Sequence, residues 1–335
     1  MPRPSVSITT ENMLSELRQH LDQHLPEFKT FEGLVGITLN GGMSREYADH
    51  LSEVDVTFYL TANAYQAWQT KRAPITQGIM MLDSQLYDIK ACDYEAELTK
   101  NWDQVALWDS SYAEILHDPE GKLKAMFDEK LNVKINPADA GGLLFQCYWY
   151  CDLAGTIWVH RGDAVQGHQM LNQAVDRLVQ ALFIVNQEFI PHEKWLLHMS
   201  RTLDWAPRNW QDRLANAMST GDMSIKSLQL RIELVRELRE EVEEYVHETF
   251  FPDLPVELSM KSHYDWLTKL VDLGSMTVAE WKEMTGESVP NSDPFYPVIR
   301  VEDDCIVFDP ETFNHIAADE MYSWHYAILQ AVRGE

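Results

Sequence analysis

The sequence predicts an α+β protein in which an N-terminal sheet with flanking helices is followed by a helical bundle. Short apolar runs bounded by turn residues, one with clean period-two alternation, occur within residues 34–92. The stretch "NVKINPADAGG", residues 132–142, is rich in Asn, Pro and Gly, as is typical of a linker. From residue 143 to 249 the apolar residues recur at helical spacing. The change of pattern at the linker therefore predicts two structural parts.

The N-terminal part is expected to begin with an amphipathic helix over residues 11–25, because its leucines fall on one face. In the best strand candidate, 53–60, apolar and polar residues alternate, so that Glu53 and Asp55 share a face with Thr57. Short helices are expected to follow up to about residue 130. The remaining predictions in this part are strands over 34–39 and 85–92 and a helix over 64–70.

The second part is expected to consist of five helices, over residues 143–160, 164–187, 193–203, 208–218 and 223–249. The charged run "RELREEVEEY" in the last of these is most simply a solvated helix face. Further on, Thr277 and Glu280 form a capping box with Gly286 as a stop, and Glu302–Asp304 lies between two apolar runs, as in a hairpin. We therefore expect domains over 1–135 and 140–255, and a C-terminal extension of unknown role over 256–335.

The composition limits the classes of partner. The 335 residues carry a formal net charge of −26, which repels nucleic-acid phosphates and anionic membranes. We therefore expect neither nucleic acid nor membrane as a partner. A cationic small molecule is compatible with the charge, although acidity is also the ordinary state of many cytosolic proteins. The charge says nothing about the oligomeric state.

The four cysteines contain no CxxC pair and have neither zinc-site nor disulfide-framework spacing, which favours a reducing compartment. The N-terminal residues lack the apolar core of a signal peptide. Residues 141–159 are long enough to span a membrane, but Gln146 and Asp152 interrupt them, so a buried bundle helix is expected instead. These observations predict a cytoplasmic location.

The stretch "LNGGMSREYADHLSEVDVTFYL", residues 39–60, is the strongest chemical signal. Adjacent glycines after an apolar strand let the backbone approach a phosphate closely. Ser44 and Arg45 follow, with a hydroxyl and a guanidinium that could hold phosphate oxygens. On the next strand Glu53 and Asp55 lie side by side, and Asp88 on the strand over 85–92 could add a third carboxylate. Such oxygen ligands suit Mg²⁺.

The order strand, Gly41-Gly42, gap, Glu53-Val54-Asp55 resembles the motif of the polymerase-beta-like nucleotidyltransferases. Within that superfamily, "YADHLSEVDV" is similar to antibiotic-type enzymes, which act on aminoglycosides or lincosamides, and to uncharacterised relatives with a helical C-terminal domain. Residues 161–197, including Lys194, are similar to the first helices of that domain. The resemblance spans roughly residues 30–215 and implies a mixed sheet, Mg²⁺ as cofactor and ATP or another NTP as co-substrate.

Two positions depart from the family pattern. Gly42 stands where a serine is frequent, so that Ser44 carries the nearest hydroxyl, and Glu53 replaces the usual aspartate. The resemblance assigns nucleotide binding to Gly41, Gly42, Ser44, Arg45 and Lys194, and both catalysis and metal binding to Glu53, Asp55 and Asp88. The strand pattern alone selects the third acid, with Asp93 as the alternative to Asp88.

These residues imply an Mg²⁺-dependent nucleotidyltransferase that moves AMP from ATP onto a hydroxyl of a small molecule, an aminoglycoside-like antibiotic being one candidate. A carboxylate of the helical part could act as general base, and Asp163, Glu188 and Glu193 stay open as candidates. The alternatives are an enzyme that adenylylates a protein and a non-catalytic nucleotide-binding relative. The spacing of Arg161 and His168 is also similar to that in HEPN-type ribonucleases, but Gly162, Gly167 and the acidic charge disfavour that hypothesis.

Overall fold

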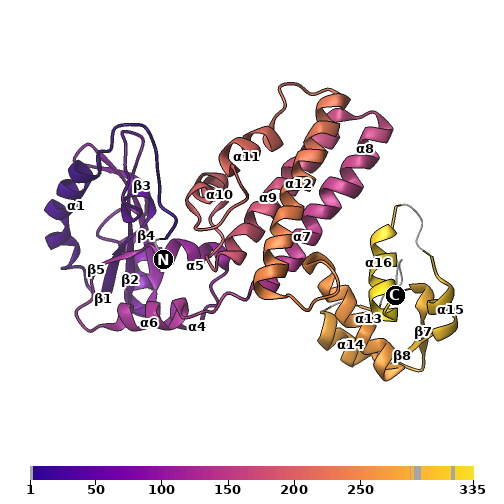
Figure 1. The fold of residues 1–335 in the computed structure, drawn as a ribbon. Helices are drawn as coiled ribbons and strands as arrows, with labels where there is room; N and C mark the ends of the chain where they lie inside the picture. The colour runs from indigo at the N-terminus through magenta and orange to yellow at the C-terminus, as the bar shows by residue number, and fades with distance from the viewer. Residues whose placement is uncertain (1–2, 287, 290–295, 318–320) are drawn as a thin grey trace. The chain divides into compact units, whose positions relative to one another are not determined.

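The computed structural model describes residues 3–286, 288–289, 296–317 and 321–335. The chain forms two compact units, and each is described by itself (Figure 1). Unit 1 comprises residues 1–135 together with 186–205, and unit 2 comprises 136–185 and 206–335. The segment 186–205, expected in the helical part, thus lies with the sheet. As a statement about independently folding domains, the sequence-based division stays a prediction.

Unit 1 is built on a five-stranded sheet with the order β3-β4-β2-β1-β5. Strands β2 and β4 are parallel and the other pairs are antiparallel, so the sheet is mixed. The strands are β1 (Leu34–Leu39), β2 (Val54–Leu60), β3 (Gly78–Leu82), β4 (Gln85–Asp93) and β5 (Glu114–His117). The three strands expected from the sequence are present, and β3 and β5 were not foreseen.

Helices pack on both faces of this sheet (Figure 1). On one face, α1 packs its buried residues Leu17, Leu21 and Phe28 against alternate residues of β2, among them Val56 and Phe58. On the other face, Tyr59 packs with Phe127 of α6 at one end of β2. The helices of unit 1 are α1 (Leu14–Phe28), α2 (Gly41–Ser44), α3 (Ala62–Ala67), α4 (Tyr94–Thr99), α5 (Gln104–Ser111), α6 (Lys122–Leu131) and α10 (Glu193–Met199).

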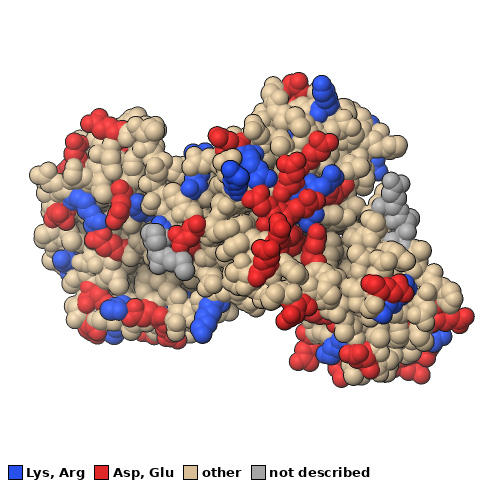
Figure 2. Space-filling model, in the orientation of Figure 1, with Lys and Arg blue, Asp and Glu red and all other residues tan. Residues whose placement is uncertain are grey.

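Unit 2 begins with a helical bundle around the long, largely buried α9. The expected helix over 143–160 is formed as α7, a π-helical segment over Trp149–Gly155 and α8 in direct succession. The bundle helices are α7 (Ala140–Tyr148), α8 (Thr156–Arg161), α9 (Ala164–Val185), α11 (Trp210–Met218) and α12 (Ile225–Phe250). A band of Asp and Glu side chains crosses the exposed side of α12 in Figure 2. The charged run is thus solvated only in part, because Glu237, Glu240 and Glu244 are exposed whereas Arg239 and Glu243 within it are buried.

The C-terminal part of unit 2 forms a small sheet with the order β6-β8-β7 and a core of its own. The expected hairpin is present, and its turn residues Asp303 and Asp304 both have positive φ. The expected capping box of Thr277 and Glu280 begins α14. The elements are α13 (Lys261–Leu273), β6 (Ser275–Thr277), α14 (Val278–Thr285), β7 (Ile299–Glu302), β8 (Cys305–Phe308), α15 (Pro310–His315) and α16 (Ser323–Arg333).

The predicted fold class, α+β with a mixed sheet followed by helices, is confirmed. Among the described helices, including the one over residues 141–159, none combines the length and the apolarity that crossing a membrane requires.

Candidate active site

Gly41, two residues after the end of β1, lies in close contact with Asp55 of β2. Gly41 has a φ of 68°, and a Cβ atom placed on it would lie 1.8 Å from Oδ2 of Asp55. The backbone N–H of Asn40 donates to the carbonyl of Asp55 over 2.9 Å, which fixes the turn against β2. Only glycine fits position 41, because the conformation is left-handed and the carboxylate fills the space of a side chain.

The acids of the second and third expected strands share one face of the sheet. Asp55 of β2 pairs in register with Asp88 of β4, and paired residues of neighbouring strands point to the same side. Burial raises the pKa of Asp55 to about 6, and the nearby carboxylates of Glu53, Asp88 and Asp109 add to this rise, whereas Lys90 opposes it. The negative electrostatic potential of these carboxylates therefore favours binding of a cation or a proton at Asp55.

The two candidates for the third acid have different roles in the structure. Asp88 is half-buried in the row with Asp55, and its Oδ2 lies 3.5 Å from Nζ of Lys90. Asp93 pairs in register with Leu60, at the far end of β2, and accepts hydrogen bonds from the N–H groups of Glu95 and Ala96. Asp93 is thus the N-cap of α4, which leaves Asp88 as the candidate beside Asp55.

A cavity of about 610 Å³ in unit 1 lies over Asp55, whereas Asp88 is not among the residues that line it. Its lining includes the motif residues Gly41, Gly42, Arg45, Glu53 and Asp55, and also Lys194 at the start of α10. The segment 186–205 thus brings Lys194 to the motif within one unit, as the resemblance implies. The exposed ammonium of Lys194 gives the acidic cavity a positive charge suited to an anionic ligand.

Arg45 and Ser44 are placed differently from the phosphate-holding role expected of them. The buried guanidinium of Arg45 donates to Oδ1 of Asp109 over 2.9 Å and lies 4.5 Å from the ring centre of Trp108. The hydroxyl of Ser44 donates to the carbonyl of Gly41 over 3.0 Å. Both side chains are engaged within the protein, so they shape the turn and the cavity wall in this structure.

Sequence reasoning missed Asp109. It lies on α5, lines the cavity and is held by Arg45. The only available signal was its helical spacing from Val105 and Ala106, which line the same cavity. Among the open candidates for a general base, Glu188 lies 3.3 Å from Arg3, and Asp163 accepts from the N–H of Gln166 near the start of α9. Glu193 is exposed on α10 next to Lys194.

The N-terminal segment also contributes to the cavity, which the sequence did not indicate. Arg3 donates to the carbonyl and the hydroxyl of Ser111, both over 2.8 Å, and stacks on Tyr112. The backbone N–H of Ser7 lies 3.2 Å from Nε2 of His198 on α10. Ile8, between these anchors and the motif, lines the cavity. The segment thus ties α10 to α5.

The carboxylates fit Mg²⁺ bound together with a phosphate better than Mg²⁺ bound alone. In the described part of the chain, no three His, Cys, Asp or Glu side chains form a group that could hold a metal ion. Mg²⁺ is usually held by one or two carboxylates, with substrate phosphates completing its shell. The raised pKa of Asp55, surrounded by other carboxylates, is the observation that favours a cation at this place.

The Arg161–His168 pair does not form a site of the ribonuclease kind. His168 is buried, and its Nδ1 lies 2.8 Å from Nη1 of Arg231 on α12. Arg161 stacks on Trp158 at the end of α8. Burial, together with the charge of Arg231, lowers the pKa of His168. The histidine is therefore part of the bundle core.

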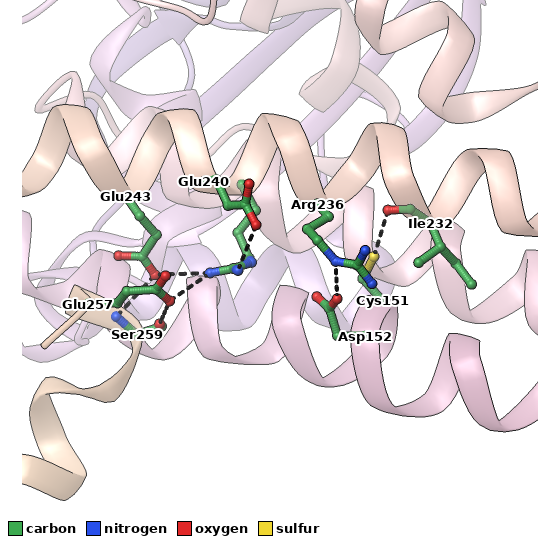
Figure 3. A network of polar contacts seen from close by, with 9 residues as sticks. Cys151, Asp152, Ile232, Arg236, Glu240, Glu243, Glu257 and Ser259 are labelled. Carbon is green, nitrogen blue, oxygen red and sulfur yellow. Dashed lines mark hydrogen bonds and ion pairs between the residues drawn. The ribbon is translucent and has the colours of Figure 1, made fainter. Parts of the chain in front are cut away.

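A second polar cluster in unit 2 has a structural role (Figure 3). The buried Glu243 of α12 accepts from the N–H groups of Leu258 and Ser259. Arg239, also buried, donates to Glu257 over 2.9 Å and lies over the ring of Tyr148. A cavity of about 620 Å³ beside these residues is lined by five glutamates, among them Glu243 and Glu257. The contacts hold the segment after α12 in place.

No protein-family model and no curated protein matches this sequence. Among solved structures, the chain is similar to a nucleotidyltransferase-like protein from Exiguobacterium sibiricum 255-15. The two share 12% sequence identity with a TM-score of 0.40, over 88% of this chain and 99% of the other. The likeness is distant, so the assignment of a function depends on the geometry of the site.

Proposed function

We propose that this chain is a nucleotidyltransferase that transfers AMP from ATP onto a hydroxyl of a small molecule. The contact of Gly41 with Asp55, in a cavity that also contains Lys194, is the observation that carries the proposal. It places a backbone turn accessible to phosphate beside a carboxylate pair suited to a cation.

The proposal assigns a separate role to the glycine turn, to Lys194 and to the carboxylates. The turn at Gly41 and Gly42 receives the phosphate chain, and Lys194 neutralises part of its charge. Asp55, with Glu53 or Asp88 as a second carboxylate, would hold Mg²⁺ together with the phosphate oxygens, to which the ion would supply positive charge. The acceptor oxygen forms a bond to the α-phosphorus, the bond to pyrophosphate breaks, and the hydroxyl proton passes to a cavity carboxylate.

The test is a pyrophosphate-release screen with the four NTPs against hydroxyl-bearing acceptors, including amino sugars and lincosamides. We expect Mg²⁺-dependent release with one NTP, and its loss in Asp55→Asn with the fold retained by circular dichroism. Equal release from the Asp55→Asn variant would rule out the assignment. The antibiotic-type acceptor stays a hypothesis that this screen addresses directly.

A non-catalytic nucleotide-binding protein is the second candidate, because two observations favour it. Lys90 lies within 3.5 Å of Asp88, and Arg45 is held by Asp109. Such a protein would bind ATP in calorimetry and release no pyrophosphate with any acceptor. A protein-modifying enzyme would instead label a partner with AMP, which mass spectrometry of copurifying chains detects.

A further inference from the structure

The row of residues that contains the acids continues to the edge of the sheet. Asp88 of β4 pairs in register with Asp55 on one side and with Ile79 of β3 on the other. Met81, two residues after Ile79, pairs with Leu86 on the same face. Paired residues point to one side of a sheet, so the order across this face is Gly41 turn, Asp55, Asp88, Ile79.

The apolar side chains at the edge of the sheet, at the end of this row, are exposed to solvent. Ile79 is 61% exposed and Met81 is 59% exposed, whereas their neighbours Met80 and Leu82 point to the other face and pack on the core. The helices that cover this face lie at the opposite end of β2, around Tyr59. Two large apolar side chains thus stand uncovered beside the carboxylates, and exposed apolar surface next to a polar site is typical of a binding surface.

The chemistry of the proposed function predicts which substrate should lie beside the apolar end of this row. In a phosphoryl displacement the attacking and leaving oxygens lie on opposite sides of the phosphorus. The phosphate chain is placed at the turn of Gly41 and Gly42, before Asp55 in the row, so the acceptor must approach from the side of Asp88 and Ile79. Neighbouring strands are about 5 Å apart, so Ile79 lies about 10 Å from Asp55 across the sheet, within the length of a small molecule.

We propose that Ile79 and Met81 contact the acceptor, which is therefore a hydroxyl compound with an apolar portion. The inference rests on the proposed function for the direction of approach. Ile79 and Met81 do not line the cavity over Asp55, so the acceptor would extend from the cavity along the sheet; the cavity lining itself includes the exposed apolar side chains of Leu51 and Val105. A cationic group elsewhere on the acceptor is compatible with the acids of the cavity.

The test uses the full chain labelled with [methyl-¹³C]methionine, and Met81→Leu assigns the Met81 signal. Benzyl alcohol, which has a hydroxyl and an apolar ring, is titrated in the presence of Mg²⁺ and α,β-methylene-ATP, and glycerol serves as the matched polar probe. We expect benzyl alcohol to shift the Met81 methyl signal saturably and glycerol to leave it unchanged. Met223 and Met321, with 54% and 48% exposure, are the internal controls and should not respond.

Two variants measure the contribution of the apolar contact. Ile79→Ser should raise the apparent dissociation constant of benzyl alcohol about tenfold, since it removes an apolar contact from the bound probe. Val133→Ser, which changes a comparably exposed apolar residue elsewhere in unit 1, should leave the apparent dissociation constant of benzyl alcohol unchanged.

Four results would overturn the inference. One is a Met81 methyl signal that does not shift on addition of benzyl alcohol. Another is a shift of the Met223 and Met321 methyl signals with the same dependence on benzyl alcohol concentration as that of Met81. A shift of Met81 by the nucleotide analogue alone would assign the surface to the nucleotide. Loss of a dimer in Ile79→Ser by sedimentation velocity would assign it to a second copy of the chain at the edge strand β3. Failure of the proposed function is distinguishable, because it shows as absent pyrophosphate release in the NTP screen, whereas the methyl signal is read without turnover.

Discussion

The carboxylate of Asp55 occupies the space that a side chain on Gly41 would fill, with Oδ2 1.8 Å from the position of a Cβ atom. The glycine motif in α2 and the acid motif around the start of β2 are therefore one structural feature. A change at either residue disturbs the position of the other. This coupling makes the turn at Gly41 the most sensitive point of the proposed site.

Gly41→Ala should displace Asp55 and abolish nucleotide binding. The matched control is Gly121→Ala, because Gly121 has a φ of 70° but no atom within 4 Å of an added Cβ. Both variants should lose about 1–2 kcal/mol of stability from the left-handed conformation. Gly41→Ala should lose more than the control in urea unfolding, and ATP binding by calorimetry should disappear in that variant alone. Equal stability and binding in the two variants would contradict the contact.

Asp88→Asn should reduce Mg²⁺-dependent turnover at least about a hundredfold if Asp88 helps to stabilise the transferring phosphate. Asp93→Asn is the control, since Asp93 caps α4 on the same strand and asparagine is an equally good N-cap. We expect normal turnover and unchanged stability for the control, measured by pyrophosphate release and thermal unfolding. The reverse pattern would move the third acid to Asp93.

The elements that could be predicted are those in which apolar residues recur with a regular period along the sequence. Alternation identified β2 and β4, and an apolar run that ends in turn residues identified β1. Strand β3, "GIMML", was missed because apolar side chains occupy both of its faces and no alternation marks it. Strand β5 has only four residues, too few for a periodic signal. The bundle helices α9, α11 and α12 were foreseen because each spans two turns or more.

Sequence geometry alone reached those residues of the candidate site that share an element, while the strand pattern selected Asp88 and the family resemblance selected Lys194. Glu53 and Asp55 are two residues apart, so the expected strand over 53–60 predicted a common face for them, although β2 itself begins at Val54. The partner of Arg45 could not be foreseen, because Asp109 reaches it from α5 through the tertiary fold. The same holds for Ile8 of the N-terminal segment, which no local pattern connects with the cavity.

Asp109→Asn should strengthen ATP binding several-fold, which is the opposite of the usual effect of a change in a site. The substitution removes a negative charge from the cavity and weakens the hold on the Arg45 guanidinium, which lies 2.9 Å from Asp109. Both effects favour an anionic ligand. Calorimetry at low and high salt measures the change, and a matched substitution at the exposed Asp103 of the same cavity separates the release of Arg45 from general charge removal. Weaker binding in Asp109→Asn would show that Asp109 itself contacts the nucleotide complex.

The stability of unit 2 should fall as the pH is lowered from about 6.5 to about 4, because His263 is partly buried among aromatic rings. Its ring lies 4.9–5.2 Å from the ring centres of Phe145, Trp266 and Trp324, and burial lowers the pKa of His263 to about 4. The unfolded chain then binds a proton that the folded chain does not, so stability is full above the unfolded pKa of about 6.5 and is lost as the pH falls through this window.

The expected loss is at most about 3 kcal/mol for His263, from a pKa difference of about 2.5 units. His325 adds in the same direction, since burial and the charge of His263 lower its pKa to about 3. His263→Phe should therefore flatten the dependence of unfolding free energy on pH, measured by urea denaturation with tryptophan fluorescence between pH 4 and 7. His160→Phe, a change at an exposed position on α8, should keep the wild-type slope. The same slope in His263→Phe as in the wild type would mean that other groups titrate in this window.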